Sequence, residues 1–332
     1  MSSDPKFSDF DIYTTVYTEV NSQAIDVDVL IPKGLKTLGL EKKKCPVVVR
    51  FHGGGLVTGT SLFTPWFPTW QLTVARTTNA ILLSPNHRLL PESTPAEILS
   101  DLSSFWTWVL HSLPTYLSTL PYYPALMVSL ENILCVGESA GGFLGVHSGL
   151  SLPKGTIGAM ALSYPMLDLR DAWFVAKPVE GEVGRHPFGA PTLDPGLIDG
   201  YLAKGREARA AGKIITSVTP PARTDFLIAL LQHGWFCEIF GEGEELYPID
   251  RVQVESKKGK RLPPMLILHG KEDSAVPVKG SERFLKTVRE CMEGVEVRLV
   301  VREGDHGFDT GLGGGEEWLR RELEWVRRVW LG

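Results

Sequence analysis

The sequence Gly-Glu-Ser-Ala-Gly at residues 137–141 says more about the fold than any other stretch of this 332-residue chain. A short apolar run, Asn132-Ile-Leu-Cys-Val136, precedes it and predicts a buried strand. Small and apolar residues follow it as far as residue 147 and predict a buried helix. A serine on such a sharp strand-to-helix turn holds its hydroxyl at the C-terminal edge of a sheet, where a base can reach it. We therefore expect Ser139 to be a nucleophile, although the same pattern also occurs as an ordinary turn.

A run of glycines follows an earlier predicted strand. Residues 46–51 are apolar and β-branched, and they lead directly into His52-Gly-Gly-Gly55. Acyl transfer from a serine passes through a tetrahedral oxyanion that fixed backbone N–H groups stabilise. Glycines let backbone amides turn toward a ligand without steric cost, and the residue after the nucleophile, Ala140, supplies a further N–H. The glycine run therefore predicts an oxyanion hole, and the alternative is a flexible loop.

A base and an acid must follow the serine in the order acid, then histidine. Residues 264–269 form an apolar strand pattern, and Asp273 lies in the loop that leaves it. Residues 295–301 form the next strand pattern, and His306 lies in the loop that follows. Both side chains are thus expected at the same edge of the sheet as Ser139, with His306 as the base and Asp273 as the group that orients it.

Other acids and histidines lie close to these candidates. Glu272 and Asp305 are each one residue away from a candidate, but Asp305 directly precedes His306 and could not easily turn to its ring. His52 belongs to the glycine run, and His269 precedes the acid, so neither follows the acid along the chain.

Together these motifs resemble the hormone-sensitive-lipase family of α/β-hydrolases. The resemblance covers roughly residues 45–170 and 262–310. It is carried by His52-Gly-Gly-Gly55, Asn86-His-Arg-Leu-Leu-Pro-Glu92, Pro95-Ala-Glu97, Asp101, Gly137-Glu-Ser-Ala-Gly-Gly142, Ser163-Tyr-Pro165 and Asp168-Leu169. The family usually has tyrosine at the position of His87, which puts the local packing in question. The segment Asp273-Ser-Ala-Val-Pro277 is more similar to dienelactone-hydrolase and oligopeptidase relatives.

The resemblance implies the site and the fold. Carried over by position, the catalytic triad is Ser139, Asp273 and His306. The amides of Gly54, Gly55 and Ala140 form the oxyanion hole, and a lid covers the pocket.

The hydrophobic pattern along the chain agrees with that fold. Residues 13–20 and 24–31 alternate apolar and polar positions and predict an antiparallel pair. Continuous apolar runs, typical of parallel strands covered on both faces, lie at 46–51, 80–85, 132–138, 158–164, 264–269 and 295–301. Helical patterns lie at 68–78, 96–111, 140–150, 278–292 and 315–330. We expect an α/β-hydrolase fold with a mostly parallel eight-stranded sheet and helices on both of its faces.

Residues 169–262 interrupt this alternation, with helical patterns only near 195–211 and 222–236. We expect them to form a lid inserted into a core made of residues 1–168 and 263–332. Substrate pockets are mostly apolar, so we expect large side chains of the lid and of the segment after the glycine run to line one. The candidate pocket residues are Phe63, Trp66, Trp235 and Phe236.

Composition narrows the class of partner. The net charge of −5 disfavours nucleic acid. No spacing of Cys, His, Asp or Glu matches a metal site, and the expected chemistry needs no cofactor. The chain contains no apolar run of membrane-spanning length and no apolar signal core, so we expect a cytoplasmic protein without a membrane span. The sequence is also compatible with a protein that forms a homodimer.

These patterns predict a carboxylesterase-type serine hydrolase that cleaves a carboxylic ester of a small to medium apolar molecule through an acyl-enzyme. The same acyl-enzyme could serve lactonisation, cyclisation or acyl transfer in a biosynthetic pathway, and an amidase would use the same machinery. A ligand receptor built on an inactive hydrolase is least favoured, because such receptors lose a member of the triad.

Overall fold

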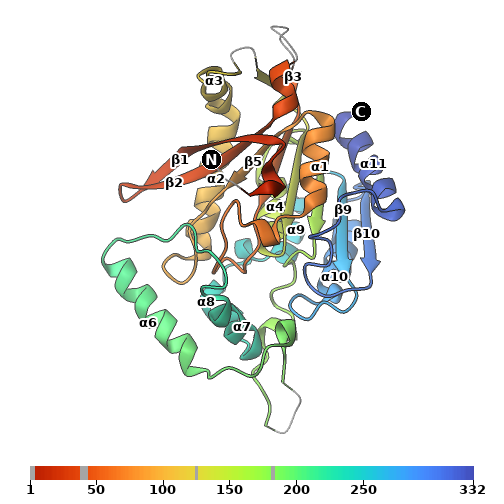
Figure 1. The fold of residues 1–332 in the computed structure, drawn as a ribbon. Coiled ribbons are helices and arrows are strands. Elements are labelled where there is room, and N and C mark those ends of the chain that lie inside the picture. Colours follow the sequence, from red (N-terminus) through yellow and green to blue (C-terminus); the bar gives the residue numbers. More distant parts are fainter. Residues whose placement is uncertain (1–3, 38–43, 124–125, 181–183) are drawn as a thin grey trace.

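The computed structural model describes residues 4–37, 44–123, 126–180 and 184–332. An eight-stranded sheet in the order β1-β2-β5-β4-β7-β8-β9-β10 lies at its centre (Figure 1). The strands are β1 Phe10–Val20, β2 Gln23–Pro32, β4 Val47–Phe51, β5 Ile81–Pro85, β7 Ile133–Glu138, β8 Ile157–Ser163, β9 Met265–Gly270 and β10 Val297–Arg302. The six strands from β5 to β10 in this order are parallel, and β2 is antiparallel to both β1 and β5. The predicted mostly parallel eight-stranded sheet is confirmed.

Side chains of the central strands alternate between two hydrophobic cores, one on each face of the sheet. In β4, Val47 and Val49 belong to one core and Val48 to the other. In β9, Ile267 and Leu268 divide in the same way. Strands covered on both faces are apolar at most positions, which is why the sequence shows these strands as nearly continuous apolar runs.

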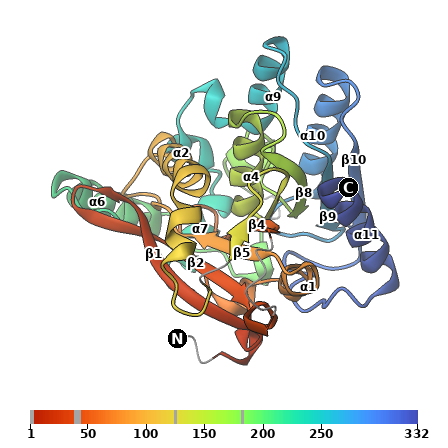
Figure 2. The same ribbon diagram turned by 90° about the horizontal axis from the view of Figure 1, so that it is seen from above.

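Helices cover both faces (Figure 2). On one face lie α2 Pro95–His111, α4 Ala140–Ser151, α9 Pro248–Lys257 and α10 Val278–Cys291, and on the other lie α1 Thr69–Thr78 and α11 Glu317–Leu331. The short helix α3 Leu113–Ser118 follows α2. All the helices predicted for the core are therefore present.

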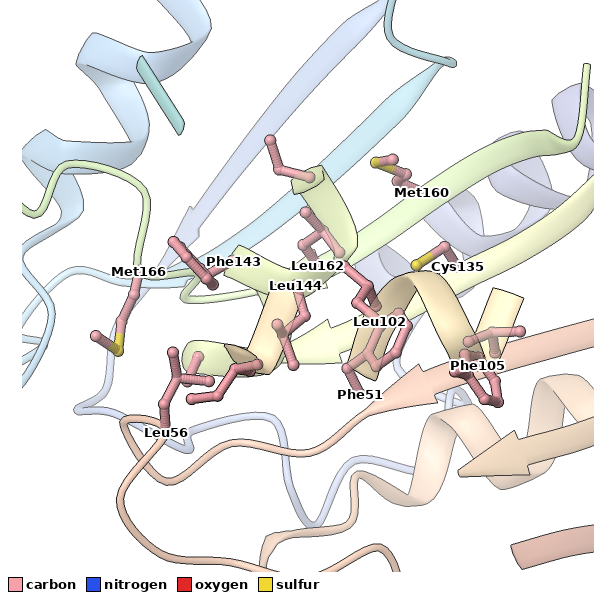
Figure 3. Packing of buried hydrophobic residues seen from close by; sticks show 14 of the residues in the cluster. Phe51, Leu56, Leu102, Phe105, Cys135, Phe143, Leu144, Met160, Leu162 and Met166 are labelled. Carbon is pink, nitrogen blue, oxygen red and sulfur yellow. The ribbon is translucent and has the colours of Figure 1, made fainter. Parts of the chain in front are cut away.

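The helix that follows the serine lies deep in the core. Figure 3 shows Phe143 and Leu144 of α4 in the same buried cluster as Phe51 of β4 and Leu162 of β8. Every residue from Ala140 to Leu150 is buried. A helix that is buried all round is held in place by packing on all sides, so the start of α4 is a rigid support for chemistry at the sheet edge.

The segment 169–262 contains the predicted helices and some additional ones. The pieces expected near 195–211 and 222–236 correspond to α6 Gly196–Ala210 and α7 Thr224–Gln232. The latter ends before residue 236 because Gly234 has a φ of +62°, a conformation that ends a helix, and a new helix, α8 Phe236–Phe240, starts after it. The short helix α5 Ala172–Val175 lies at the start of the segment.

The helices α6, α7 and α8 gather at one end of the sheet in Figure 1, where the parallel strands end. The last helix of the segment, α9, instead packs against α4 and α10 beside the sheet (Figure 2). The division into a core and a lid formed by residues 169–262 stays a proposal, although α9, at the end of that segment, packs on helices of the core.

A small parallel pair formed by β3 Lys44–Cys45 and β6 Met127–Val128 was not expected from the sequence. Within the described ranges, no helix combines the length and the apolar character that crossing a bilayer requires.

Candidate active site

Ser139 occupies the turn between β7 and α4. Its backbone has φ 54° and ψ −116°, a conformation that a non-glycine residue rarely adopts and that costs about 1–3 kcal/mol. The turn passes so close to β4 that a Cβ atom on Gly141 would lie 1.9 Å from the carbonyl oxygen of Phe51. The Ser139 amide donates to the Ser163 carbonyl at 2.9 Å, and its carbonyl accepts from the Met166 amide at 3.0 Å. The surrounding strands thus hold the strained turn in place.

Asp273 and His306 come together from the loops after β9 and β10. The Nδ1 atom of His306 donates to Oδ2 of Asp273 at 2.8 Å. The other carboxylate oxygen, Oδ1, accepts the amides of Ala275 at 2.9 Å and Val276 at 2.7 Å. These bonds fix both the rotation of the carboxylate and the tautomer of the imidazole, because Nδ1 carries the proton and leaves Nε2 free to accept one.

The Asp273 carboxylate stays ionised in spite of its surroundings. Burial alone would raise the pKa of Asp273, but the charge of His306 and hydrogen bonds from His269, His306 and Val276 hold it well below its usual range. His269 lies behind the carboxylate, with its Nε2 atom 3.3 Å from Oδ2 of Asp273 and 2.8 Å from the Val276 carbonyl. Its Nδ1 atom lies 2.9 Å from the Ser281 hydroxyl.

The two neighbouring acids bind backbone instead of the imidazole. Oε2 of Glu272 accepts the Gly304 amide at 2.7 Å. Oδ1 of Asp305 accepts the amides of Ser274 and His306, both at 2.7 Å. Both side chains therefore join the loops that follow β9 and β10, and of the three candidate acids it is Asp273 that contacts the ring.

The glycine run follows β4 and borders the same cavity as Ser139. Gly54 has a φ of +107° and Gly55 a φ of +63°, and a Cβ atom on Gly54 would lie 2.1 Å from the Thr58 carbonyl oxygen. Only glycine fits there. Ala140 is the first residue of α4, so its amide has no carbonyl in its own helix to bind.

His87, where the resembled family usually has tyrosine, packs against His52. The His87 ring stacks on the His52 ring with centroids 4.6 Å apart and an interplanar angle of 9°. Burial lowers the pKa of both rings, so that they stack as neutral imidazoles. The Nδ1 atom of His52 lies 2.8 Å from the Gly53 carbonyl, which ties the stacked pair to the glycine run.

A buried ion pair supports the strand before the nucleophile. Arg50 in β4 binds both carboxylate oxygens of Glu138, at 3.1 and 3.0 Å, and Gln71 donates to Oε1 of Glu138 at 2.7 Å. Burial raises the pKa of Glu138, and the charge and hydrogen bonds of Arg50 oppose that rise. Since Glu138 directly precedes Ser139, this pair anchors the turn to its neighbouring strand.

A second buried acid ties the histidine loop to the sheet. Oδ2 of Asp309 accepts the Ser163 hydroxyl at 2.5 Å and Nε1 of Trp70 at 2.9 Å. Asp309 lies three residues after His306, so these bonds restrict the position of the imidazole.

Ser139 and His306 border one cavity of about 280 Å³. Its wall is mostly apolar and comes from the core and from the segment 169–262. The lining residues are Gly53, Gly54, Gly55, Trp66, Glu138, Ser139, Tyr164, Met166, Phe174, Phe188, Thr224, Leu227, Leu231, Phe236, Ala275, Val276, His306, Gly307 and Thr310. Among the described residues, no group of three or more His, Cys, Asp or Glu side chains is arranged to hold a metal ion.

Two of the four candidate pocket residues lie in this wall, and two do not. Trp66 and Phe236 line the cavity, whereas Phe63 and Trp235 are not among its described lining residues. The Phe63 ring packs edge-on against Trp66, 5.0 Å between centroids. The Nζ atom of Lys177 lies over the Trp235 ring, 4.5 Å from the centroid of that ring. Phe63 therefore lies behind the wall residue Trp66, and Trp235 packs against Lys177, which does not line the cavity.

Some lining residues carried little signal in the sequence. Tyr164 and Met166 follow β8, and the Tyr164 ring packs against the His306 ring at 4.4 Å. Their position directly after a parallel strand could have indicated that they line a pocket, since ligands bind at that edge of such sheets.

Comparisons with known proteins agree with this architecture. The sequence profile of a family described as alpha/beta hydrolase fold matches residues 48–208. The profile of the prolyl oligopeptidase family matches residues 229–331, the part that contains the loop after Asp273.

Curated relatives are named as carboxylesterases. The chain is 32% identical over 317 residues to a probable carboxylesterase M8 of Phoma sp., covering 95% of this chain and 94% of that protein. It is 32% identical over 201 residues to a probable carboxylesterase of Cochliobolus lunatus, covering 60% and 86%.

Solved esterase structures share the fold. Esterase 2 of Thermogutta terrifontis phosphorylated by paraoxon has a TM-score of 0.58 at 16% identity, covering 99% of this chain and 97% of that one. Carboxyl esterase 2 of Tuber melanosporum has a TM-score of 0.57 at 15% identity, covering 96% and 85%. With the sheet order, the sequence profiles and the full-length relative in agreement, this chain belongs to the carboxylesterase family of α/β-hydrolases and is a hydrolase enzyme.

Proposed function

We propose that this protein hydrolyses a carboxylic ester of a small to medium apolar molecule through an acyl-enzyme formed on Ser139. His306 takes the proton of the serine hydroxyl and passes it to the leaving alcohol, and Asp273 stabilises the imidazolium that forms. Water then attacks the acyl-enzyme with His306 as its base.

The observation that carries this proposal is the paired Asp273 carboxylate and His306 ring beside the cavity that Ser139 borders. A serine is a weak nucleophile unless a base accepts its proton. The bond at Nδ1 leaves Nε2 of His306 available for that purpose.

The glycine run supports the stabilisation of the intermediate. Gly54 and Gly55 line the cavity beside Ser139, and the Ala140 amide starts a helix whose N-terminus favours negative charge. Such preorganised donors act at the oxyanion as it forms and need no rearrangement during the reaction.

The size and polarity of the cavity support the substrate class. A volume of about 280 Å³ is at the lower end for small-molecule sites, and the apolar wall disfavours a charged acyl group. Thermogutta terrifontis esterase 2, which shares the fold, has been solved with butyrate bound. We therefore place the substrate among esters of short to medium apolar acyl groups.

The direct test is Ser139→Ala against a series of p-nitrophenyl esters of increasing acyl length. We expect kcat to fall by roughly 10³-fold or more with the fold intact, because the triad acts as a unit. Ser118→Ala, at an exposed serine away from the cavity, is the matched control and keeps its activity. A phosphonate that modifies active serines should label Ser139 in the parent protein and nothing in Ser139→Ala. More than a tenth of the parent activity in Ser139→Ala would refute the mechanism.

A further inference from the structure

Phe188 is a strained and exposed aromatic residue at the mouth of the cavity. Its backbone has φ 57° and ψ 23°, the left-handed region that an aromatic residue rarely adopts. Its side chain is among the few large apolar ones that remain exposed, at 46%, although it also lines the cavity. Strain that persists beside a reactive site, together with exposed apolar surface, calls for a functional reason.

The Phe188 ring lies against the catalytic base. It packs edge-on to the His306 ring, with centroids 5.7 Å apart and an interplanar angle of 75°. Tyr164 packs against the same imidazole from the core, at 4.4 Å. The base therefore lies between one buried and one exposed aromatic ring.

Hydrogen bonds fasten the Phe188 turn to the loops that carry the acid and the base. The Phe188 amide donates to the Ser274 hydroxyl at 2.9 Å, and that hydroxyl donates to Asp305 at 2.9 Å. Asp305 also accepts the His306 amide. The turn itself is closed by bonds from Gly189 to the His186 carbonyl, at 2.9 Å, and from Ala190 to the Pro187 carbonyl, at 3.0 Å. The loops that carry Asp273 and His306 thus hold the backbone of Phe188 in place, and the ring packs against His306 from that position.

The position of the ring beside His306 decides which half of the substrate it meets. When the tetrahedral intermediate collapses to the acyl-enzyme, the bond to the alcohol oxygen breaks and His306 gives that oxygen the proton it took from Ser139, so that the alcohol must lie against the imidazole. The acyl group remains on Ser139, and we assign it to the more buried apolar wall that includes Phe174, Leu231 and Phe236, since these side chains are far less exposed than Phe188.

We propose that Phe188 determines specificity for the alcohol half of the ester, and that the preferred substrates are esters of aromatic or bulky apolar alcohols whose leaving group contacts this ring at the cavity mouth. An aromatic alcohol can pack edge-to-face on Phe188, an interaction that adds to the burial of apolar area. The inference rests on the proposed ester hydrolysis at Ser139.

The test separates the two halves of the substrate. One series of acetate esters varies the alcohol from methyl to benzyl and naphthylmethyl, with release of acid followed by pH-stat titration. The other series keeps p-nitrophenol and varies the acyl group from acetyl to octanoyl. The proteins are the parent, Phe188→Ala, Phe188→Gly and Phe188→Tyr. Phe188→Gly removes the ring and also relieves the left-handed strain, so that lost folding cannot imitate lost specificity.

We expect the benzyl-to-methyl ratio of kcat/KM to fall roughly 10-fold in Phe188→Ala and Phe188→Gly, and Phe188→Tyr to restore most of it. The octanoyl-to-acetyl ratio should stay within about twofold of the parent in all three variants. Tyr122→Ala, at another exposed aromatic residue outside the cavity wall, should leave both ratios unchanged.

Several outcomes would overturn the proposal. An unchanged alcohol ratio in Phe188→Gly would show that the ring does not select the alcohol. A loss confined to the acyl series would place Phe188 on the other half of the substrate. Both readings require that acetate hydrolysis is lost in Ser139→Ala; activity that survives that change would refute the hydrolase mechanism itself and not the role of Phe188.

Discussion

Replacement of Asp273 by asparagine tests the acid of the site with the smallest change of shape. In the structure, Oδ1 of Asp273 accepts the amides of Ala275 and Val276, and Oδ2 accepts Nδ1–H of His306 at 2.8 Å. The single oxygen of an asparagine would keep the two backbone bonds, because they are donated by fixed amides. Its NH₂ group would then face the ring of His306.

An NH₂ group cannot accept the proton on Nδ1, so the imidazole changes tautomer and carries its proton on Nε2. That nitrogen must accept the proton of Ser139, and the base is lost. An exchange of this kind lowers kcat by about 10⁴-fold in serine proteases. We therefore expect kcat/KM to fall about 10³- to 10⁴-fold, which corresponds to roughly 4–5.5 kcal/mol of transition-state stabilisation.

The assay is steady-state hydrolysis of p-nitrophenyl butyrate, with circular dichroism as a check on folding. Asp305→Asn and Glu272→Gln are the matched controls, since each replacement keeps an oxygen that can accept the backbone amides bound in the structure. We expect each control to lose less than about tenfold, because neither side chain contacts the ring. Equal losses at Asp273 and Asp305, or more than a tenth of the activity left in Asp273→Asn, would refute this reasoning.

Three further predictions follow from the same contacts. Burial would raise the pKa of Asp273, but the charge of His306 and hydrogen bonds hold it well below its usual range, so the pH profile of kcat/KM should show no ionisation where a free carboxyl group titrates; a loss of activity centred in that range would contradict this expectation. Arg50→Met should lower the free energy of unfolding by about 3–5 kcal/mol in urea titrations, because it leaves a buried carboxylate without its counter-charge, and an unchanged midpoint would count against the pair. Phe236→Ala should change the preference among esters of graded size by about 1–3 kcal/mol in kcat/KM, because Phe236 lines the cavity. Trp235→Ala should leave that preference unchanged, because Trp235 is not among the described lining residues. Equal effects of the two substitutions would place the pocket elsewhere.

Much of the fold was readable from local patterns. The central strands are buried on both faces, which favours apolar residues at most of their positions, and the apolar runs at 46–51, 132–138 and 264–269 match β4, β7 and β9 closely. The turn at Ser139 was also readable, because a Cβ atom at Gly141 would collide with the neighbouring strand. These features depend on periodicity and on turn chemistry, which act over a few residues.

The direction in which a side chain points from an irregular loop could not be predicted from such local patterns. The order in which the triad residues must follow one another limited the candidates for the acid to a few residues. Of these, Glu272, Asp273 and Asp305 differ only in how their loops turn after the strands. Neighbouring residues of the segment 169–262 differ in the same way, since Phe236 lines the cavity and Trp235 packs beside Lys177. No periodicity governs such positions, so contacts with distant parts of the chain decide them.

The sequence by itself determined the strands of the sheet and the strand-to-helix turn at Ser139, because each depends on chemistry within a few residues. Only the tertiary structure brought Phe188 against His306, 118 positions later in the chain. That contact joins separate loops at one edge of the sheet. Their geometry depends on how the whole core packs, and no short stretch of sequence contains that information.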